Sequence, residues 1–240
     1  MKVRDDVDLR VLADAEAVAV AAAEIMVASA RLGGQVALSG GSTPKRAYRL
    51  AAEALDDWSS ARLWLGDERH VPLDDERSNA RMVREQLIDV LEPAGRPRFE
   101  EVAVELSLHQ AAADYDGRLR SALHNGSGLD LAIMGLGPDA HTASLFPGKP
   151  AVEERRRWVV EVREPGMVPW VPRVTMTLPV FDSAHQAVFL VAGADKAAAV
   201  ARAFGDPPDP TAPSGMIHPR EGRLLVLADP PAAAELDRPE

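Results

Sequence analysis

Short apolar runs alternate along the chain with longer segments that mix apolar and charged residues. Apolar runs bounded by glycine, proline or charged residues are typical of buried strands, and the longer mixed segments are typical of helices. The pattern predicts strands at Gln35–Ser39, Arg62–Gly66, Phe99–Val104, Leu129–Met134, Trp158–Val162, Arg173–Thr177, Ala187–Val191 and Gly222–Leu227. It predicts helices at Ala13–Arg31, Lys45–Leu55, Ser78–Leu91, His109–Leu123 and Ala194–Phe204.

This order of elements predicts one α/β domain. Strands that alternate with helices form a mainly parallel sheet covered on both faces, so we expect a three-layer α/β/α, Rossmann-like architecture. Residues 1–240 are expected to form a single domain, because the sequence has no evident repeat and no linker long enough to divide it. The Pro- and Ala-rich tail from about residue 230 is expected to fray.

Composition narrows the class of protein. The hydrophobic share of 46% is ample for a large core, yet no uncharged apolar run approaches the ~18 residues of a membrane span. The opening MKVRDDVDLR lacks the apolar stretch of a secretory signal, and the sequence contains no cysteine. We therefore expect a cytoplasmic protein that binds no membrane and has no disulfides, thiolate nucleophiles or cysteine zinc sites.

Net charge restricts the partners. The formal charge of −10 argues against broad nucleic-acid binding, which needs a basic surface to displace counterions. It also repels small anions, so an anionic substrate would need a local group of basic side chains and N–H donors. Arg69, Arg173 and Lys196 lie at the edges of predicted β-elements and together could supply that group. Arg173 or Lys196 alone would be interpreted as a surface charge.

Residues 129–148 carry the strongest chemical signal. A predicted strand is followed by GLG at 135–137 and then by DAH at 139–141. Open α/β sheets build their sites at the carboxyl ends of strands, and a histidine there can act as acid or base near neutrality. His141 held by Asp139 is therefore a candidate catalytic pair. The alternative is that Asp139 and Thr142 cap a helix and His141 is solvated.

A second candidate loop, SGGSTP at 39–44, also joins a predicted strand to a helix. Gly40 and Gly41 would let the backbone approach a ligand closely. Ser42 or Thr43 could be the N-cap of the helix, with proline at its first position, and the N–H groups of that helix start could bind a phosphate. Taken alone, the loop is better explained by an ordinary well-capped helix.

Three ionisable residues, Asp67, Glu68 and Arg69, follow the next buried strand. Charges beside a dry core are costly unless they are paired or used. A carboxylate here could hold sugar hydroxyls, and Arg69 could bind a phosphate or anchor the loop. An internal Asp–Arg ion pair is an equally good interpretation of these residues.

Cofactor and metal sites are not expected. Residues 135–140 fit the G-x-G-x-x-A pattern of dinucleotide-binding loops. However, the motif lies in mid-chain, Pro138 removes a donor, and Asp139 would place negative charge beside a pyrophosphate. The histidines other than His141 show no metal-ligand spacing.

Three motifs occur in a fixed order: LSGGSTP at 38–44, GDERHVPLDDERSN at 66–79 and MGLGPDAHTASLFPG at 134–148. Together with VPRVTMTLPVF at 171–181 and VAGADKAAAV at 191–200, they resemble the 6-phosphogluconolactonase family, part of a larger group that includes glucosamine-6-phosphate deaminase. The resemblance spans most of the chain. It implies hydrolysis of 6-phospho-D-glucono-1,5-lactone to 6-phospho-D-gluconate in the oxidative pentose phosphate pathway.

The resemblance also implies roles for the candidate residues. His141, held by Asp139, would take a proton from water as it attacks C1 and return it to the ring oxygen. Backbone N–H groups near Gly137 or a following helix start would hold the oxyanion. Ser42, Thr43 and basic side chains would bind the 6-phosphate. The expected substrate-binding residues are Gly40, Gly41, Ser42, Thr43, Asp67, Glu68, Arg69, Gly137, Arg173 and Lys196.

The related deaminase is the main competing interpretation. The deaminase carries tyrosine where this chain has Arg69, and a glutamate that orients the histidine where this chain has Phe146. The chain also departs from the lactonase pattern, because Ala140 replaces the usual glycine between the aspartate and the histidine. If that position needs a positive φ, alanine costs ~1 kcal/mol there.

Two alternative functions thus remain beside the lactonase, namely a deaminase-type aldose–ketose isomerase and a non-catalytic sugar-phosphate sensor. The expected partner is a small phosphosugar lactone, and the expected state of the chain is a monomer or weak homodimer.

Overall fold

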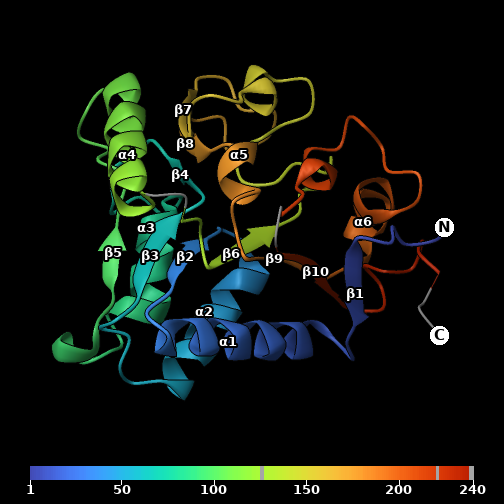
Figure 1. The fold of residues 1–240 in the computed structure, drawn as a ribbon, viewed down its shortest axis with the longest axis horizontal. Coiled ribbons are helices and arrows are strands. Elements are labelled where there is room, and N and C mark those ends of the chain that lie inside the picture. The colour runs from blue at the N-terminus through green and yellow to red at the C-terminus, as the bar shows by residue number, and fades with distance from the viewer. Residues whose placement is uncertain (125–126, 220–221, 238–240) are drawn as a thin grey trace.

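The computed structural model describes residues 1–124, 127–219 and 222–237 (Figure 1). At its centre is a parallel seven-stranded sheet with strand order β1-β10-β9-β6-β2-β3-β5. The strands are β1 (Val7–Val11), β2 (Gln35–Leu38), β3 (Arg62–Leu65), β5 (Arg98–Glu100), β6 (Leu131–Gly135), β9 (Gln186–Val191) and β10 (Arg223–Ala228). Within the described ranges, no helix is long and apolar enough to cross a membrane.

Helices cover both faces of the sheet, as the sequence predicts. One face, drawn downward in Figure 1, is covered by α1 (Ala15–Arg31), α2 (Ser42–Ala54), α3 (Asn79–Val83) and the π-helical turn η1 (Arg84–Ile88). The other face is covered by α4 (Leu108–Ala122), α5 (Leu178–Phe181) and α6 (Ala197–Phe204). Strand side chains alternate between the two cores: Ile133 belongs to the cluster that includes α1 and α2, and Met134 to the cluster that includes α4 and α6. The three-layer α/β/α prediction is confirmed.

A small antiparallel sheet adjoins the main one near α4 and α5 (Figure 1). It contains β4 (Asp67–Arg69), β8 (Arg173–Met176) and β7 (Val159–Val162), in that order. β4 follows β3 after the single residue Gly66. The sequence predicts β7 and β8 as strands but does not predict their separate sheet, because pairing partners lie far away in the chain.

Both ends of the chain differ from expectation. β1 is absent from the predicted strands, since only Leu9 of this edge strand is buried and its apolar pattern is weak. Residues 230–237 are not frayed: they form turns, with Ala232, Ala233 and Leu236 buried in the core. The carboxylate of Asp229 accepts the N–H of Ala232 and thereby caps this turn. The rest of the predicted frayed tail, residues 238–240, lies outside the described residues.

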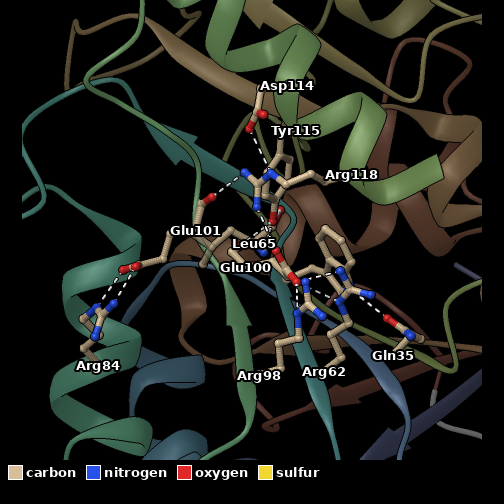
Figure 2. A network of polar contacts seen from close by, with 11 residues as sticks. Gln35, Arg62, Leu65, Arg84, Arg98, Glu100, Glu101, Asp114, Tyr115 and Arg118 are labelled. Atoms are coloured by element: carbon tan, nitrogen blue, oxygen red, sulfur yellow. Dashed lines mark hydrogen bonds and ion pairs between the residues drawn. The ribbon is translucent and has the colours of Figure 1, made fainter. Parts of the chain in front are cut away.

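Paired charges hold the outer edge of the sheet, where β5 meets α4 (Figure 2). The carboxylate of Glu100 accepts hydrogen bonds from Arg62 at 2.9 Å, Arg98 at 2.5 Å and Arg118 at 2.8 Å. Burial by itself would raise the pKa of Glu100, but these hydrogen bonds outweigh it and hold the pKa below its usual value. This cluster, called the edge network below, fastens β3, β5 and α4 together.

The remaining short turns are the 3-10 segments η2 (Pro93–Gly95), η3 (Pro150–Glu153), η4 (Ala194–Lys196) and η5 (Pro213–Met216). Two of them border the region described next, because η4 follows β9 and η5 packs beside α6.

Candidate active site

A cavity of about 290 Å³ opens where the loops after β2, β6 and β9 meet the small sheet. Most of the predicted site residues line it: Gly40, Gly41, Ser42, Thr43, Asp67, Arg69, Gly137, His141, Arg173 and Lys196. Two predicted residues do not. Asp139 holds His141 from outside the lining, and Glu68 is buried away from the cavity.

The loop after β2 places a helix start against the cavity. Gly41 is the N-cap of α2 with φ 116°, a conformation that favours glycine. Gly40 lies so close to Asn79 that a Cβ would sit 2.3 Å from its Oδ1. The prediction of Ser42 or Thr43 as N-cap is wrong, because α2 already begins at Ser42. No side chain of the described residues caps α2, so its first N–H groups can bind an anion.

The loop after β6 presents His141. Its Nδ1 lies 2.5 Å from Asp139 Oδ1, and its backbone N–H donates to the same oxygen at 3.1 Å. A carboxylate on Nδ1 favours the tautomer whose other nitrogen, Nε2, is the proton acceptor. The ring lies against Gly137, where a Cβ would come within 2.1 Å of Nδ1. The His141 side chain is 17% exposed, enough to meet a bound ligand.

This loop is a series of turns and not the predicted helix start. Ala140 has φ 66° and Ala143 has φ 48°, which a right-handed helix cannot contain. The expected strain of alanine at a positive φ is therefore present at Ala140. The Gly137 N–H donates to the His141 carbonyl, so neither it nor a helix start here is available to an oxyanion.

Residues from the far end of the chain fasten the same loop. The backbone N–H and hydroxyl of Ser214, in η5, both donate to the Ala140 carbonyl. Arg202 of α6 donates to the Asp139 carbonyl at 3.4 Å. The His141–Asp139 pair is thus held by packing against η5 and α6 as well as by its own turn.

Glu68 is a structural residue, contrary to its prediction as a substrate ligand. It is fully buried and accepts hydrogen bonds from the N–H groups of Arg69, Asn79 and Ala80 and from the Ser78 hydroxyl. Burial raises the pKa of Glu68, and these donors offset only part of that rise. Its oxygens are occupied at the start of α3, so it is not placed to touch a ligand.

Asp67 joins the small sheet to the loop after β6. Its Oδ2 accepts a hydrogen bond from the Ser144 hydroxyl at 2.6 Å and lies 3.9 Å from Arg173 Nη1. Asn79 donates to its carbonyl at 2.8 Å. The internal Asp–Arg pair considered from the sequence therefore exists, but with Arg173 of β8 and not with Arg69.

Three cations line the cavity. Arg173 is buried, which lowers its pKa against the opposing effect of Asp67. Arg69 is anchored through one donor to the Arg77 carbonyl at 2.6 Å, and Lys196 lies 3.4 Å from Asp195. Among the described residues, the buried Nε atoms of Arg69 and Arg173 have no hydrogen-bond partner. Buried donors of this kind are normally satisfied, so the two guanidinium groups beside the cavity are incompletely hydrogen-bonded.

Several residues that build the site received no role from the sequence. Ser39, Met167 and Val168 line the cavity, while Ser144 and Asn79 hold Asp67. The position of Ser39 at the end of a predicted strand was an available signal. Nothing local marks Met167 and Val168, which reach the cavity from the loop between β7 and β8. In the described part of the chain, no group of three or more metal-ligating side chains is gathered.

Known proteins resemble this chain in sequence and in fold. Residues 8–226 match the family model described as glucosamine-6-phosphate isomerases/6-phosphogluconolactonase. The chain is 36% identical over 206 residues to a 6-phosphogluconolactonase of Nostoc sp., covering 84% of each protein. It is also 36% identical over 220 residues to the 6-phosphogluconolactonase of Homo sapiens, covering 89% of this chain and 84% of the relative.

A solved structure gives the same result. The 6-phosphogluconolactonase from Trypanosoma brucei matches with a TM-score of 0.83 and 26% identity, covering 95% of this chain and 97% of that chain. The chain therefore belongs to the glucosamine-6-phosphate isomerase/6-phosphogluconolactonase family.

Proposed function

We propose that this chain hydrolyses 6-phospho-D-glucono-1,5-lactone to 6-phospho-D-gluconate in the oxidative pentose phosphate pathway. The relatives that are 36% identical bear the lactonase name. The observation in the molecule itself that carries the proposal is the His141–Asp139 pair, with a 2.5 Å contact, at the wall of a cation-lined cavity.

The chemistry needs one positioned base. His141 Nε2 takes a proton from water as the water oxygen bonds to C1, while Asp139 stabilises the imidazolium that forms. The imidazolium then returns the proton to the ring oxygen as the C1–O bond breaks, and the product is the open-chain acid. A lactone is already an electrophilic ester, so the proposal includes no metal, cofactor or covalent nucleophile.

The substrate phosphate binds at the cationic side of the cavity. The first turn of α2, with Ser42 and Thr43, offers N–H and hydroxyl donors, and Arg69, Arg173 and Lys196 offer charge. Such charge-assisted hydrogen bonds are roughly twice as strong as neutral ones. This local group of cations lets a chain of net charge −10 bind an anion. The proposed enzyme is cytoplasmic and acts as a monomer or weak homodimer.

Phe146 argues against deaminase chemistry at this site. The resemblance implies that the deaminase has a glutamate here to orient its histidine, whereas the Phe146 ring centroid lies 4.5 Å from that of His141. A phenyl ring cannot accept the imidazole proton as a carboxylate does. The histidine is therefore oriented by Asp139 alone among the carboxylates described around it.

To test the proposal, purified protein is incubated with 6-phosphogluconolactone and, separately, with glucosamine 6-phosphate, in the presence of a chelator. We expect acid release from 6-phosphogluconolactone above spontaneous hydrolysis, and no ammonia from glucosamine 6-phosphate. Ammonia at enzymatic rates would replace the lactonase proposal with the deaminase alternative. Binding of 6-phosphogluconate with no turnover of either compound would instead identify a sugar-phosphate sensor.

A further inference from the structure

Phe146 is a buried aromatic residue that lies beside the candidate site and outside the hydrophobic core clusters. It is 1% exposed. Among the buried aromatic side chains of the described residues, it is the one that belongs to neither hydrophobic cluster. Two of its neighbours, His141 and Arg173, line the cavity, and a third, Gly166, directly precedes the lining residue Met167.

The first contact is with the base. The rings of Phe146 and His141 lie 4.5 Å apart between centroids with an interplanar angle of 41°. Asp139 restrains the imidazole at Nδ1, and Gly137 leaves room for it. A hydrogen bond at one atom still permits the ring to tilt about that atom. The phenyl contact restricts this tilt and so determines where Nε2 points.

The second contact is with a cation of the cavity. The Arg173 guanidinium carbon lies 5.2 Å from the centroid of the Phe146 ring, within cation–π range. The nearest carboxylate oxygen, on Asp67, is 3.9 Å from Arg173 Nη1 and is shared with the Ser144 hydroxyl. The aromatic face is therefore one support of a guanidinium whose nearest carboxylate oxygen is 3.9 Å away.

The third contact is with the loop 163–172. A Cβ at Gly166 would lie 2.8 Å from the Phe146 Cβ, so this loop packs directly on the phenylalanine. The next residues of the loop, Met167 and Val168, line the cavity. Arg173 donates to the carbonyls of Met167 and Pro169 at 3.1 Å each. The cavity wall is thus held by Phe146 and by the arginine that Phe146 supports.

We infer that Phe146 is a positioning residue for the hydrolysis, which sets the orientation of the His141 imidazole, the Arg173 guanidinium and the loop 163–172 together. The inference rests on the proposed lactonase function. A buried phenylalanine with a purely structural role would instead affect stability without a selective effect on catalysis.

The test compares Phe146→Leu with Phe204→Leu, a matched control. Phe204 is also fully buried in an edge-to-face aromatic pair, with Phe189, but it lies outside the cavity lining. Misplacement of a catalytic group by about 1 Å can cost roughly 10²-fold. For folded Phe146→Leu we expect kcat on the phosphorylated lactone to fall about 10- to 100-fold, and Phe204→Leu to keep the wild-type kcat.

A double-mutant cycle then separates positioning from structure. In the His141→Ala background, Phe146→Leu should lower kcat little further, because its effect passes through the missing imidazole. Its effect on KM should persist for 6-phosphogluconolactone, through Arg173, and should be absent for unphosphorylated gluconolactone. Equal kcat losses in both backgrounds, or equal losses in Phe146→Leu and Phe204→Leu, would overturn the inference.

Gly166→Ala supplies a second variant should Phe146→Leu fail to fold. The added methyl group would displace Phe146, because it would lie too close to the Phe146 Cβ. We therefore expect kcat to fall although His141 and Arg173 are unchanged. Gly117→Ala in α4 is its control, because a Cβ there meets no atom within 4 Å. Wild-type kcat in folded Gly166→Ala and Phe146→Leu would remove Phe146 from the mechanism while the lactonase proposal stands. Absence of turnover in the wild type would remove both.

Discussion

The edge network around Glu100 and the cavity around His141 both gather charged side chains, but they pair those charges differently. In the edge network each arginine has a carboxylate within hydrogen-bond distance, because Arg62, Arg98 and Arg118 all donate to Glu100 (Figure 2). In the cavity, the nearest carboxylate oxygen to Arg173 is 3.9 Å away. The buried Nε atoms of Arg69 and Arg173 have no partner within the described residues.

This difference separates structural charges from charges kept for a ligand. A closed set of ion pairs satisfies itself and needs nothing from outside. An incomplete set beside a cavity keeps donors for an anion and carries a desolvation cost until one binds. The pKa directions agree, since the carboxylate of Glu100 is held below its usual pKa by arginines while burial lowers the pKa of Arg173.

The largest expected effect is on the cavity side. His141→Ala should lower kcat on the lactone by about 10²–10⁴-fold, the usual contribution of a positioned base, with the thermal midpoint unchanged. The control is His109→Ala, because His109 also pairs with a carboxylate, Glu161 at 3.3 Å, but is exposed. Rates are measured after subtraction of spontaneous hydrolysis. A His141→Ala enzyme with near-normal turnover would exclude the imidazole as the base.

The next prediction compares the incompletely paired cations of the cavity with the fully paired arginines of the edge network. Lys196→Ala and Arg173→Ala should each cost about 1.5–3 kcal/mol in kcat/KM on the phosphorylated lactone, and much less on unphosphorylated gluconolactone. Arg98→Ala, from the edge network, should leave both values unchanged because Arg98 pairs with Glu100 and does not line the cavity. Equal losses on the two lactones would mean that the cavity cations are structural.

The smallest effect is on stability at the edge network. Glu100→Gln removes the shared charge of three arginines and should lower the free energy of unfolding by about 1–3 kcal/mol, with kcat/KM unchanged. Urea unfolding measures the loss. Unchanged stability would show that the edge arginines are solvated well enough without their partner.

The stability loss in Glu100→Gln should also depend on pH. Because the folded-state pKa of Glu100 lies below its usual value, its stabilisation is complete above about pH 4.3, the ordinary glutamate value. It is lost as the pH falls through the folded-state pKa. The stability difference between wild type and Glu100→Gln should therefore stay constant from neutrality to about pH 5 and shrink below about pH 4.

Much of the fold follows from local pattern. The core strands β2, β3, β6, β9 and β10 are predicted because their apolar residues face both cores, and their loops carry the polar site motifs. The edge strand β1 is missed because one face of it has little to bury. The helix start that Asp139 and Thr142 could have capped after β6 is absent, because Ala140 and Ala143 adopt positive φ.

The sequence by itself determined the contacts between residues that are close together along the chain. Asp139 and His141 are two positions apart, so a local turn is enough to bring their side chains within hydrogen-bond distance. Likewise, the sequence alone indicates that the backbone at Gly40 and Gly41 can approach another group closely, because glycine has no Cβ.

Only the tertiary structure decided which distant residues meet. Arg173 reaches Asp67 because β8 pairs with β4, and Glu68 is withdrawn from the cavity because the start of α3 packs over it. Phe146 contacts His141, Arg173 and Gly166 through the folding of three separate segments. Contacts of this kind depend on strand pairing and packing over long sequence separations, which local hydrophobic patterns do not encode.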